Sequence, residues 1–237
     1  MANGFTLIIP TYHEAMNIPE LINKIAAVDF GDSAFEVLLI DDNSDDGSVE
    51  IVNEISKKYP WLKMIVRNEG RNHGLSIMTG FHHAKYPIMI TMDADLSHPP
   101  EKIPDIINVL NDPDVEVVLG SRYIKGGSVD GKWPLFRRIS SKLSVLISRI
   151  VLPCDVKDPL SGFMAIRKKT LVNGDTLSPI GWKIGLELMV KCRCKNIREI
   201  PIHFSERTKG KSKLNVEISL EYFYHVLLLM KYKLFAK

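Results

Sequence analysis

The stretch FEVLLIDDNSDDG, residues 35–47, decides the fold. Its first six residues are almost entirely apolar and predict a buried strand. The polar run after them holds four aspartates and one glycine, which is typical of a loop at a strand end. Residues 48–58 then carry a helical pattern. A strand, a polar loop and a helix in this order form the repeating unit of α/β proteins.

The same unit recurs through the first half of the chain. Further apolar runs predict strands at residues 5–9, 62–67, 88–92 and 115–120, and helical patterns occupy residues 16–27, 76–83 and 101–110. This spacing predicts an α/β fold, a Rossmann-like sandwich around a mostly parallel central sheet. Ligands of such sheets bind beyond the carboxyl ends of the strands, so the polar loops after Ile9, Ile40 and Met92 are expected to share one crevice.

The second half of the chain is less regular. Short strands are predicted at residues 163–166 and 198–204, and a helix at residues 184–191. Residues 135–152 and 217–235 place apolar residues at helical spacing, but charged residues interrupt both segments. Neither segment reaches the roughly 18–20 uninterrupted apolar residues that a bilayer-spanning helix needs. We therefore expect amphipathic C-terminal helices that lie on a membrane surface or, alternatively, pack against the core.

Charge divides the chain into two unlike halves. The overall composition, with 45% hydrophobic and 25% charged residues among 237, is that of a globular protein. Residues 1–121 contain 8 basic and 19 acidic residues, whereas residues 122–237 contain 23 basic and 9 acidic ones. An acidic half suits a metal, and a basic half suits phosphates or an anionic membrane; a solvated surface is the alternative for both.

These halves suggest a domain organisation. We expect one domain at residues 1–213, with an acidic half at 1–121 and a basic half at 122–213, and then an amphipathic membrane-proximal helix at 214–237. The three cysteines form neither an even framework nor a zinc pattern, which predicts reduced thiols in the cytoplasm.

Two aspartates at a strand end are candidates for metal binding. Asp93 and Asp95 directly follow the predicted strand at residues 88–92. Like charges one residue apart repel each other, but they suit a hard divalent cation, Mg²⁺ or Mn²⁺, that also bridges substrate phosphates. An acidic surface turn is the alternative interpretation.

Other strand ends supply candidates for nucleotide binding. Asp41 and Asp42 end the second strand, where a carboxylate can bond a base or a ribose; alternatively they cap the helix that starts near Ser48. The first strand-end loop could line the same crevice with Pro10, Thr11, Tyr12 and Glu14.

The basic half offers partners for phosphate groups. Candidates are Arg122, Arg137, Arg207, Lys209, Lys211 and Lys213. Residues 207–213 hold four cations, no acid and one glycine, which suits a phosphate clamp or, alternatively, a solvated loop. The sequence contains no phosphate loop of the type Gly-x-x-x-x-Gly-Lys-Ser/Thr and no Gly-x-Gly-x-x-Gly turn.

Taken in order, these motifs carry a family resemblance over nearly the whole chain. The runs IIPTYHE (8–14), IDDNSDDG (40–47) and MDADLSHP (92–99) resemble the family-two inverting glycosyltransferases, whose fold is of the GT-A type. The polyprenyl (dolichyl) phosphate mannosyltransferases are similar in the runs GSRY (120–123), DPLSGF (158–163), GWKIGLE (181–187) and Arg207 to Lys213. Two departures are His13, where Asn is common, and a looser form of the basic-glycine segment at residues 71–76.

The resemblance implies that residues 1–213 are a catalytic domain, with a nucleotide and metal half at 1–121 and an acceptor half at 122–213, and it implies roles for individual residues. It places the nucleotide sugar on Pro10, Thr11, Tyr12, Glu14, Asp42, Asp93 and Arg122. It gives catalytic roles to Asp93, Asp95 and Arg122, and it places the metal on Asp93, Asp95 and Ser97, the last standing where relatives carry Gln. For the acceptor phosphate it implies Arg137, Ser141, Arg207 and Lys213.

The reaction that the resemblance implies is transfer of mannose from GDP-mannose to a polyprenyl phosphate with inversion. An acceptor phosphate is already an anion near neutral pH, which fits the lack of an obvious general base in the sequence. The enzyme is expected to be peripheral, at the cytoplasmic face of a membrane, with no nucleic-acid partner; a separate membrane-anchoring subunit is left open. The alternatives are UDP-glucose as donor, a phospho-accepting receiver-like signalling protein, and a non-catalytic membrane scaffold.

Overall fold

The computed structural model describes residues 4–131, 135–152, 155–171, 177, 183–206 and 216–235, with the backbone alone at 135–138 and 216–220. The strands are β1 (Phe5–Thr11), β2 (Phe35–Asp41), β3 (Leu62–Val66), β4 (Ile88–Thr91), β5 (Val117–Ser121), β6 (Ser128–Val129), β7 (Met164–Arg167), β8 (Ile197–Pro201) and β9 (His203–Phe204). The helices are α1 (Ile18–Ala26), α2 (Ser48–Lys58), α3 (His73–His83), α4 (Ile103–Leu110), α5 (Leu135–Val151), α6 (Lys168–Leu171), α7 (Ile184–Lys191) and α8 (Val216–Phe235), and the short 3₁₀ helix η1 (Pro100–Lys102) precedes α4.

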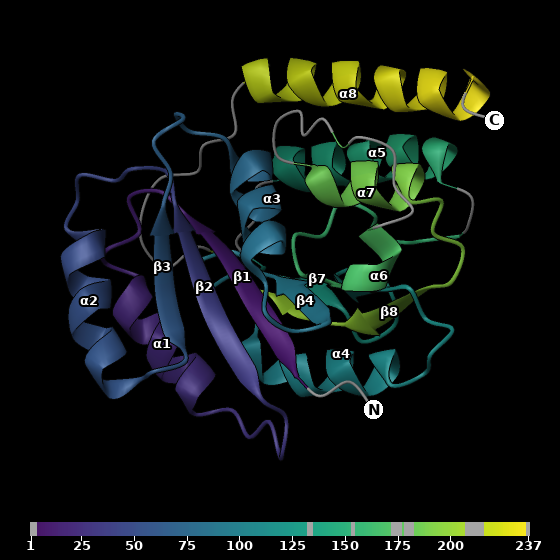
Figure 1. Cartoon of the computed structure of the whole chain (residues 1–237). Coiled ribbons are helices and arrows are strands. Elements are labelled where there is room, and N and C mark those ends of the chain that lie inside the picture. The colour runs from purple at the N-terminus through teal and green to yellow at the C-terminus, as the bar shows by residue number, and fades with distance from the viewer. Residues whose placement is uncertain are drawn as a thin grey trace.

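The centre of the molecule is a seven-stranded sheet in the order β3-β2-β1-β4-β7-β5-β8. All neighbouring strands run parallel except β7, which is antiparallel to both β4 and β5. Helices α1, α2 and α4 lie on one side of this sheet, and α3, α5 and α7 lie on the other, with α8 outermost (Figure 1). The predicted α/β fold with a mostly parallel sheet is confirmed.

The central strands β1, β2, β4, β5 and β7 are buried on both faces, which explains why they appear in the sequence as continuous apolar runs. In β1, Ile8 packs into the core beneath α3, whereas Leu7 and Ile9 pack into the core beneath α1 and α4. This alternation follows from the two-residue period of a strand. Each such side chain, fully buried, contributes about 1.5–3 kcal/mol of transfer free energy.

Helix α3 lies unusually close to the sheet. A Cβ atom on Gly80 would stand 2.2 Å from Cγ2 of Ile8, so only glycine permits this approach. The helix begins earlier than the predicted residue 76, because the Asn72 side chain accepts a hydrogen bond from the Leu75 N–H at 3.0 Å and caps it. The close packing fixes the amino end of α3 at the carboxyl edge of the sheet.

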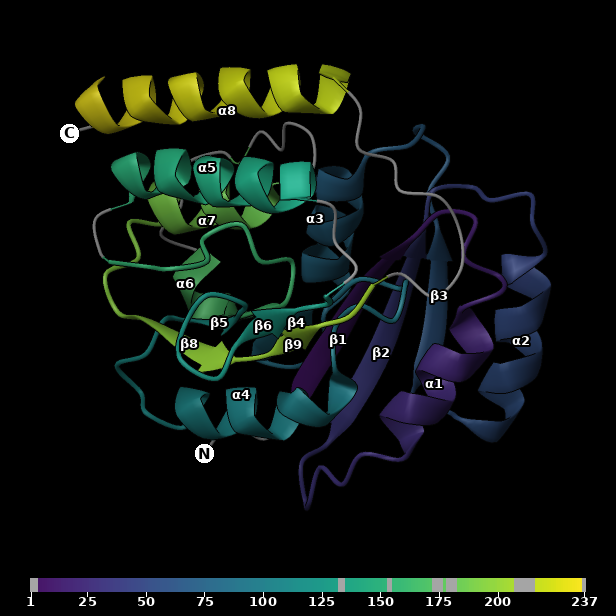
Figure 2. The ribbon, with the colours of Figure 1, turned by 180° about the vertical axis from the view of Figure 1, so that it is seen from behind.

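The predicted strand at residues 198–204 is divided into two. Strand β8 pairs with β5, and then the Ile202 N–H donates to the Ser121 carbonyl at 3.0 Å. Beyond this point the chain leaves the main sheet, and β9 pairs with β6 in a separate two-stranded sheet, seen from behind in Figure 2.

The outer layer consists of α5 and α8, which lie side by side in both views (Figures 1 and 2). Tyr222 of α8 joins them, since its hydroxyl donates to the Ser144 carbonyl at 2.6 Å and lies 2.8 Å from the Ser148 hydroxyl. Helix α5 is amphipathic, as predicted, whereas α8 carries large apolar residues among both its buried and its exposed side chains, so the predicted amphipathic pattern is weak there. None of the helices within the described residues is both long and apolar enough to cross a bilayer.

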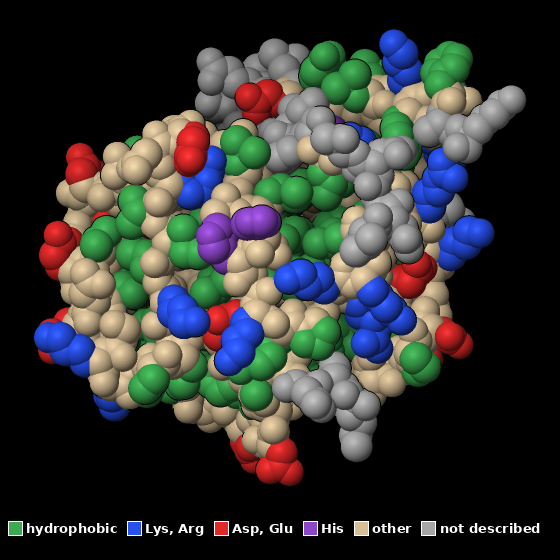
Figure 3. Space-filling model, in the orientation of Figure 1, with side chains coloured by type: hydrophobic (Ala, Val, Ile, Leu, Met, Phe, Trp, Pro, Cys, Tyr) green, Lys and Arg blue, Asp and Glu red, His purple; other side chains and the backbone are tan. Residues whose placement is uncertain are grey.

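Large apolar side chains are nevertheless exposed on these two helices, and we call them the apolar face. They are Ile139, Leu143, Leu146 and Ile150 of α5 and Phe223, Tyr224, Leu227, Met230, Leu234 and Phe235 of α8. Figure 3 shows hydrophobic side chains along the upper edge, where α8 lies, next to lysine or arginine side chains.

Candidate active site

A cavity lies at the carboxyl ends of β1, β2 and β4, and we call it the donor cavity. Its lining residues are Pro10, Thr11, Tyr12, Glu14, Asp42, Arg71, His73, Asp93, Ala94 and Asp95. The loops after β1, β2 and β4 therefore share one crevice, as the strand pattern predicted.

The Asp93–Asp95 turn is held in a fixed geometry. Ser97 donates to Asp95 Oδ1 twice, from its hydroxyl at 2.5 Å and from its N–H at 3.1 Å. The intervening Leu96 has φ = +65°, a left-handed conformation that is costly for a bulky residue. The Asp93 N–H donates to Nδ1 of His98 at 3.0 Å. The turn is thus shaped before any ligand binds.

The two carboxylates differ in exposure. The Asp93 side chain is 35% exposed, whereas Asp95 is buried. Among the described residues no three His, Cys, Asp or Glu side chains cluster as a metal cage. Mg²⁺ is bound in proteins through one or two carboxylates, with water and substrate phosphates completing its shell, so this pair fits such an ion. Since the Ser97 hydroxyl is bonded to Asp95, its predicted role as a metal ligand stays a prediction.

Asp42 is fully engaged by the segment that leads into α3. Its carboxylate accepts from the Ser76 hydroxyl at 2.6 Å and the Asn72 N–H at 2.8 Å, and it forms a buried ion pair with Arg67. Asp42 also lines the donor cavity. It therefore holds the cavity wall in place, and its predicted nucleotide contact remains a prediction.

Asp41 and Asp46 shape the neighbouring loop. Asp41 is completely buried and accepts from the hydroxyls of Thr11, at 2.9 Å, and Ser44, at 2.8 Å. The hydroxyl of Ser48, the first residue of α2, donates to Asp46 at 2.6 Å. Asp46, and neither Asp41 nor Asp42, is thus the acidic residue that contacts the start of this helix.

The entrance of the donor cavity carries aromatic and cationic groups. The Arg71 guanidinium lies 4.8 Å from the ring centroid of Tyr12, and His13 stacks on the same ring at 4.1 Å. Glu14 is buried and accepts from the Asn17 amide at 2.5 Å. Arg71 was not among the predicted site residues, although the basic-glycine segment at 71–76 pointed to this part of the chain.

A second cavity continues from the donor cavity past Asp93 and His73, which line both. We call it the inner cavity, and its remaining lining residues are His98, Arg122, Leu160, Ser161, Gly162, Lys183 and Phe204. A Cβ atom on Gly162 would stand 3.3 Å from the His98 ring and 3.4 Å from an Asp93 carboxylate oxygen, so a side chain there would crowd both groups. The inner cavity brings cations to within reach of the acidic turn.

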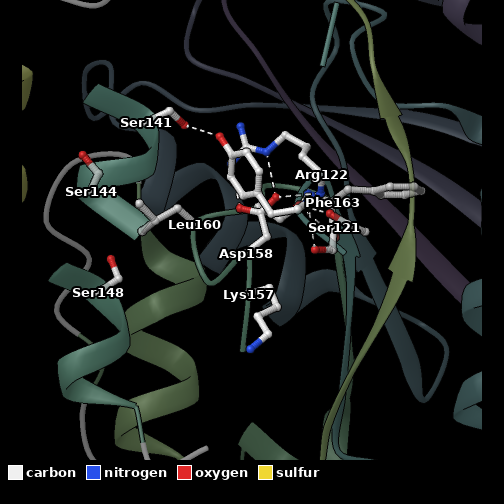
Figure 4. Close-up of polar contacts among 12 residues, drawn as sticks. Ser121, Arg122, Ser141, Ser144, Ser148, Lys157, Asp158, Leu160 and Phe163 are labelled. Atoms are coloured by element: carbon white, nitrogen blue, oxygen red, sulfur yellow. Dashed lines mark hydrogen bonds and ion pairs between the residues drawn. The ribbon is translucent and has the colours of Figure 1, made fainter. Parts of the chain in front are cut away.

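Arg122 is held by Asp158 (Figure 4). Its Nε and Nη2 donate to the two carboxylate oxygens at 2.7 Å each, and its backbone N–H donates to Oδ2 at 2.9 Å. Burial acts to lower the pKa of Arg122, but Asp158 more than offsets this, and the net pKa lies above its ordinary value. Asp158 is itself completely buried, so Arg122 is a fixed and permanently charged fork.

His98 is a site residue that was missed in the sequence. Its ring packs against Phe163 at 5.4 Å and against Phe204 at 5.2 Å, and burial lowers its pKa, an effect that Asp93 partly opposes. Because Nδ1 accepts from the Asp93 N–H, the neutral ring carries its proton on Nε2. Its place directly after the acidic turn was the available signal.

The predicted acceptor residues are only partly described. Ser141 of α5 lies 2.8 Å from the Tyr123 hydroxyl, next to Arg122, which ties α5 to the inner cavity (Figure 4). The Arg137 side chain, Arg207 and Lys213 lie outside the described residues. Their predicted contacts with the acceptor phosphate remain predictions.

Comparison with protein families and sequences gives a consistent result. Residues 6–173 match the model of glycosyl transferase family 2. The chain is 40% identical over 230 residues to a dolichol-phosphate mannosyltransferase of Pyrococcus furiosus, covering 96% of this chain and 64% of that protein. It is 35% identical over 232 residues to the protein of that name from Saccharomyces cerevisiae, covering 94% of this chain and 85% of that one.

Solved structures with the same fold are also glycosyltransferases. A mannosyltransferase from Pyrobaculum calidifontis in complex with GDP-mannose and Mn²⁺ has a TM-score of 0.65 at 19% identity, covering 100% of this chain and 71% of that one. Glucosyl-3-phosphoglycerate synthase from Mycobacterium tuberculosis, with Mn²⁺ and UDP, has a TM-score of 0.70 at 16% identity, covering 98% of this chain and 80% of that one.

Proposed function

The chain belongs to glycosyl transferase family 2, and from this premise we propose that it transfers mannose from GDP-mannose to the phosphate of a polyprenyl (dolichyl) lipid, with inversion. Relatives at 34–40% identity from three organisms bear the name dolichol-phosphate mannosyltransferase. The chain spans 64% of the length of the Pyrococcus relative. The receiver alternative loses its support with the family assignment, and metal-dependent sugar transfer tests the scaffold alternative.

The observation that carries the proposal is the contact between two unlike cavities. The donor cavity holds Asp93 and Asp95, and the inner cavity, reached past Asp93, holds Arg122 and Lys183. An acidic pair next to two cations is suited to a reaction between two phosphate-bearing substrates. The cations reduce the repulsion between the substrates, and the carboxylates hold the counter-ion of the donor.

On the donor side, Asp93 and Asp95 would hold Mg²⁺ or Mn²⁺ together with the donor diphosphate. When bound, such an ion supplies a Lewis acid for the departing nucleotide diphosphate. Ser97 keeps the Asp95 carboxylate in orientation through two hydrogen bonds. Pro10, Thr11, Tyr12, Glu14 and Asp42 line the part of the cavity left for the nucleotide.

On the acceptor side, the attacking group is a phosphate oxygen that needs little deprotonation. Arg122, fixed by Asp158, presents its remaining N–H groups to the inner cavity. Ser141 is tied to the same place through Tyr123. Arg137, Arg207 and Lys213 are proposed to add positive charge around the acceptor phosphate.

A lipid acceptor requires contact with a membrane, and the apolar face of α5 and α8 fits this requirement. Its exposed Leu, Ile and Phe side chains are accompanied on the same helices by Lys142, Lys231 and Lys233, which are exposed as well. Apolar side chains with nearby lysines are typical of helices that lie in the interface of a membrane with anionic lipids. We propose a peripheral enzyme at the cytoplasmic face, with or without an anchoring subunit.

The test is sugar transfer with purified chain and a polyprenyl phosphate in detergent. Labelled GDP-mannose and labelled UDP-glucose are supplied separately, each with Mg²⁺, with Mn²⁺ and with EDTA. Metal-dependent product from GDP-mannose alone is expected. Product from UDP-glucose alone would overturn the choice of sugar, and undiminished product in EDTA would overturn the metal.

A further inference from the structure

Lys183 is a cation of the inner cavity to which no individual contact has been assigned above. It immediately precedes α7, and its ammonium group donates to the Leu160 carbonyl at 3.3 Å. Within the described part of the chain no carboxylate forms a salt bridge with it. Burial lowers the pKa of Lys183, and the charge of Arg122 lowers it further, whereas Asp93 and Asp158 act in the opposite direction.

Comparison with Arg122 shows that Lys183 lacks a carboxylate partner within the described residues. The charge of Arg122 is balanced by the bidentate contact with Asp158, which uses both carboxylate oxygens. Lys183 has only the dipole of a carbonyl group at hydrogen-bonding distance among the described residues. A partly buried cation without a paired anion is costly, and an anionic ligand would reduce that cost.

The backbone near Lys183 adds to the positive potential. Helix α7 starts at Ile184, and Ile184, Gly185 and Leu186 of its first turn line a small third cavity that also contains Lys183. The amino end of a helix carries partial positive charge and unpaired N–H groups, which favour an anion. The ammonium group and the helix end therefore favour the same kind of ligand.

The third cavity has a volume of about 20 Å³, which is room for little more than one water molecule. Besides Lys183 and the first turn of α7, its lining residues are His73, Ile77, Thr91, Pro159, Leu160, Ser161, Gly162 and Met164. The inner cavity, which Lys183 also lines, is larger at about 100 Å³ and contains His98, Arg122 and Asp93. An anion larger than a water molecule therefore contacts Lys183 from the inner cavity.

We propose that Lys183 binds the phosphate of the lipid acceptor within the inner cavity. The inference rests on the proposed function for the identity of the ligand. It adds to the acceptor site a residue that contacts the reacting phosphate in the cavity that Arg122 also lines.

The experiment compares Lys183→Met, Lys183→Arg and the control Lys195→Met, which removes an exposed lysine after α7. Binding of geranylgeranyl phosphate in micelles, of inorganic phosphate and of GDP-mannose is measured by calorimetry, and melting temperature is recorded. Losing one charge-assisted contact should weaken geranylgeranyl phosphate binding at least about tenfold in Lys183→Met. Lys183→Arg should stay within about threefold of wild type, since it keeps the charge.

Further readouts separate this role from a structural one. GDP-mannose affinity should be unchanged in all variants, and Lys183→Met should melt at or above the wild-type temperature, because it removes a partly buried charge that has no carboxylate partner within the described residues. Unchanged lipid phosphate binding, or an equal loss of GDP-mannose binding, would overturn the proposal. Inorganic phosphate binding as tightly as geranylgeranyl phosphate would overturn the lipid part. Lys183-dependent lipid binding without any mannose transfer would overturn the proposed function and leave this site intact.

Discussion

The two sides of the active site are built in opposite ways. On the donor side, Asp41, Asp42 and Asp95 all accept hydrogen bonds from neighbouring residues of the protein. On the acceptor side, Lys183 has no paired carboxylate among the described residues, and α5 and α8 expose large apolar side chains. The donor side is thus complete by itself, whereas the acceptor side presents surface and charge that suit a lipid phosphate and a membrane.

This difference predicts which property a substitution on each side should change. A change on the donor side removes a group that already holds other groups in place, so it should affect both the chemistry and the order of the site. A change at Lys183 or on the apolar face should affect affinity for the lipid and leave the folded chain intact, whereas Asp158, which already holds Arg122 in place, should behave like a donor-side residue. The predictions below test this distinction, beginning with the largest effect.

Asp95→Ala should lower mannose transfer by at least about a thousandfold, because it removes one of two carboxylates proposed to hold the donor diphosphate through a metal ion. Transfer rates and calorimetric GDP-mannose binding with and without Mn²⁺ measure the effect. Asp105→Asn, an exposed carboxylate paired with Lys102, is the control. Normal turnover in Asp95→Ala would remove Asp95 from the mechanism.

Asp158→Ala should leave Arg122 buried without its partner. Breaking a buried pair in this way costs about 3–5 kcal/mol, and transfer should also fall, because the guanidinium loses its fixed position. Chemical denaturation and kinetics on Asp158→Ala, Arg122→Met and the double variant form a cycle. Strictly additive effects would show that Asp158 does not act through Arg122.

Gly80→Ala should destabilise the fold by about 1–3 kcal/mol through overpacking, because the new methyl group meets Ile8 at 2.2 Å. The control is Gly131→Ala, where an added Cβ has no neighbour within 4 Å. Denaturation midpoints give the comparison. Equal midpoints for both variants would mean that α3 can shift away from β1 without cost.

Replacing Ile150 and Leu227 with Glu should weaken binding to anionic vesicles about tenfold or more, since both side chains belong to the apolar face. GDP-mannose binding should not change, because neither residue lines the donor cavity. Vesicle co-sedimentation and calorimetry are the measurements. Full vesicle binding by the double variant would place the membrane contact elsewhere.

The donor side could be predicted from the sequence because its determinants are local. Each buried strand is a continuous apolar run, and each polar loop follows directly, so Asp42, Asp93 and Asp95 could be assigned to one crevice. The antiparallel direction of β7 could not be predicted, since the apolar run at residues 163–166 is the same in either direction. Strand pairing depends on contacts far apart in the chain.

The acceptor side was harder to predict because its partners are distant in sequence. Asp158 contacts Arg122 across a separation of 36 residues, and its role becomes visible only once β5 and β7 are paired. Lys183 lay within a run quoted for its family resemblance, but its place between two cavities depends on how α7 packs. The pattern of apolar and polar residues along the chain does not show which residues distant in sequence contact each other.

The most direct test of the central claim is the anomeric configuration of the product. The chain is incubated with GDP-mannose, a polyprenyl phosphate and Mn²⁺, and the purified lipid is examined by NMR. Inverting transfer to a lipid phosphate predicts a β-linked mannosyl phosphate ester. An α-linked ester, or release of free mannose with no lipid product, would contradict the account.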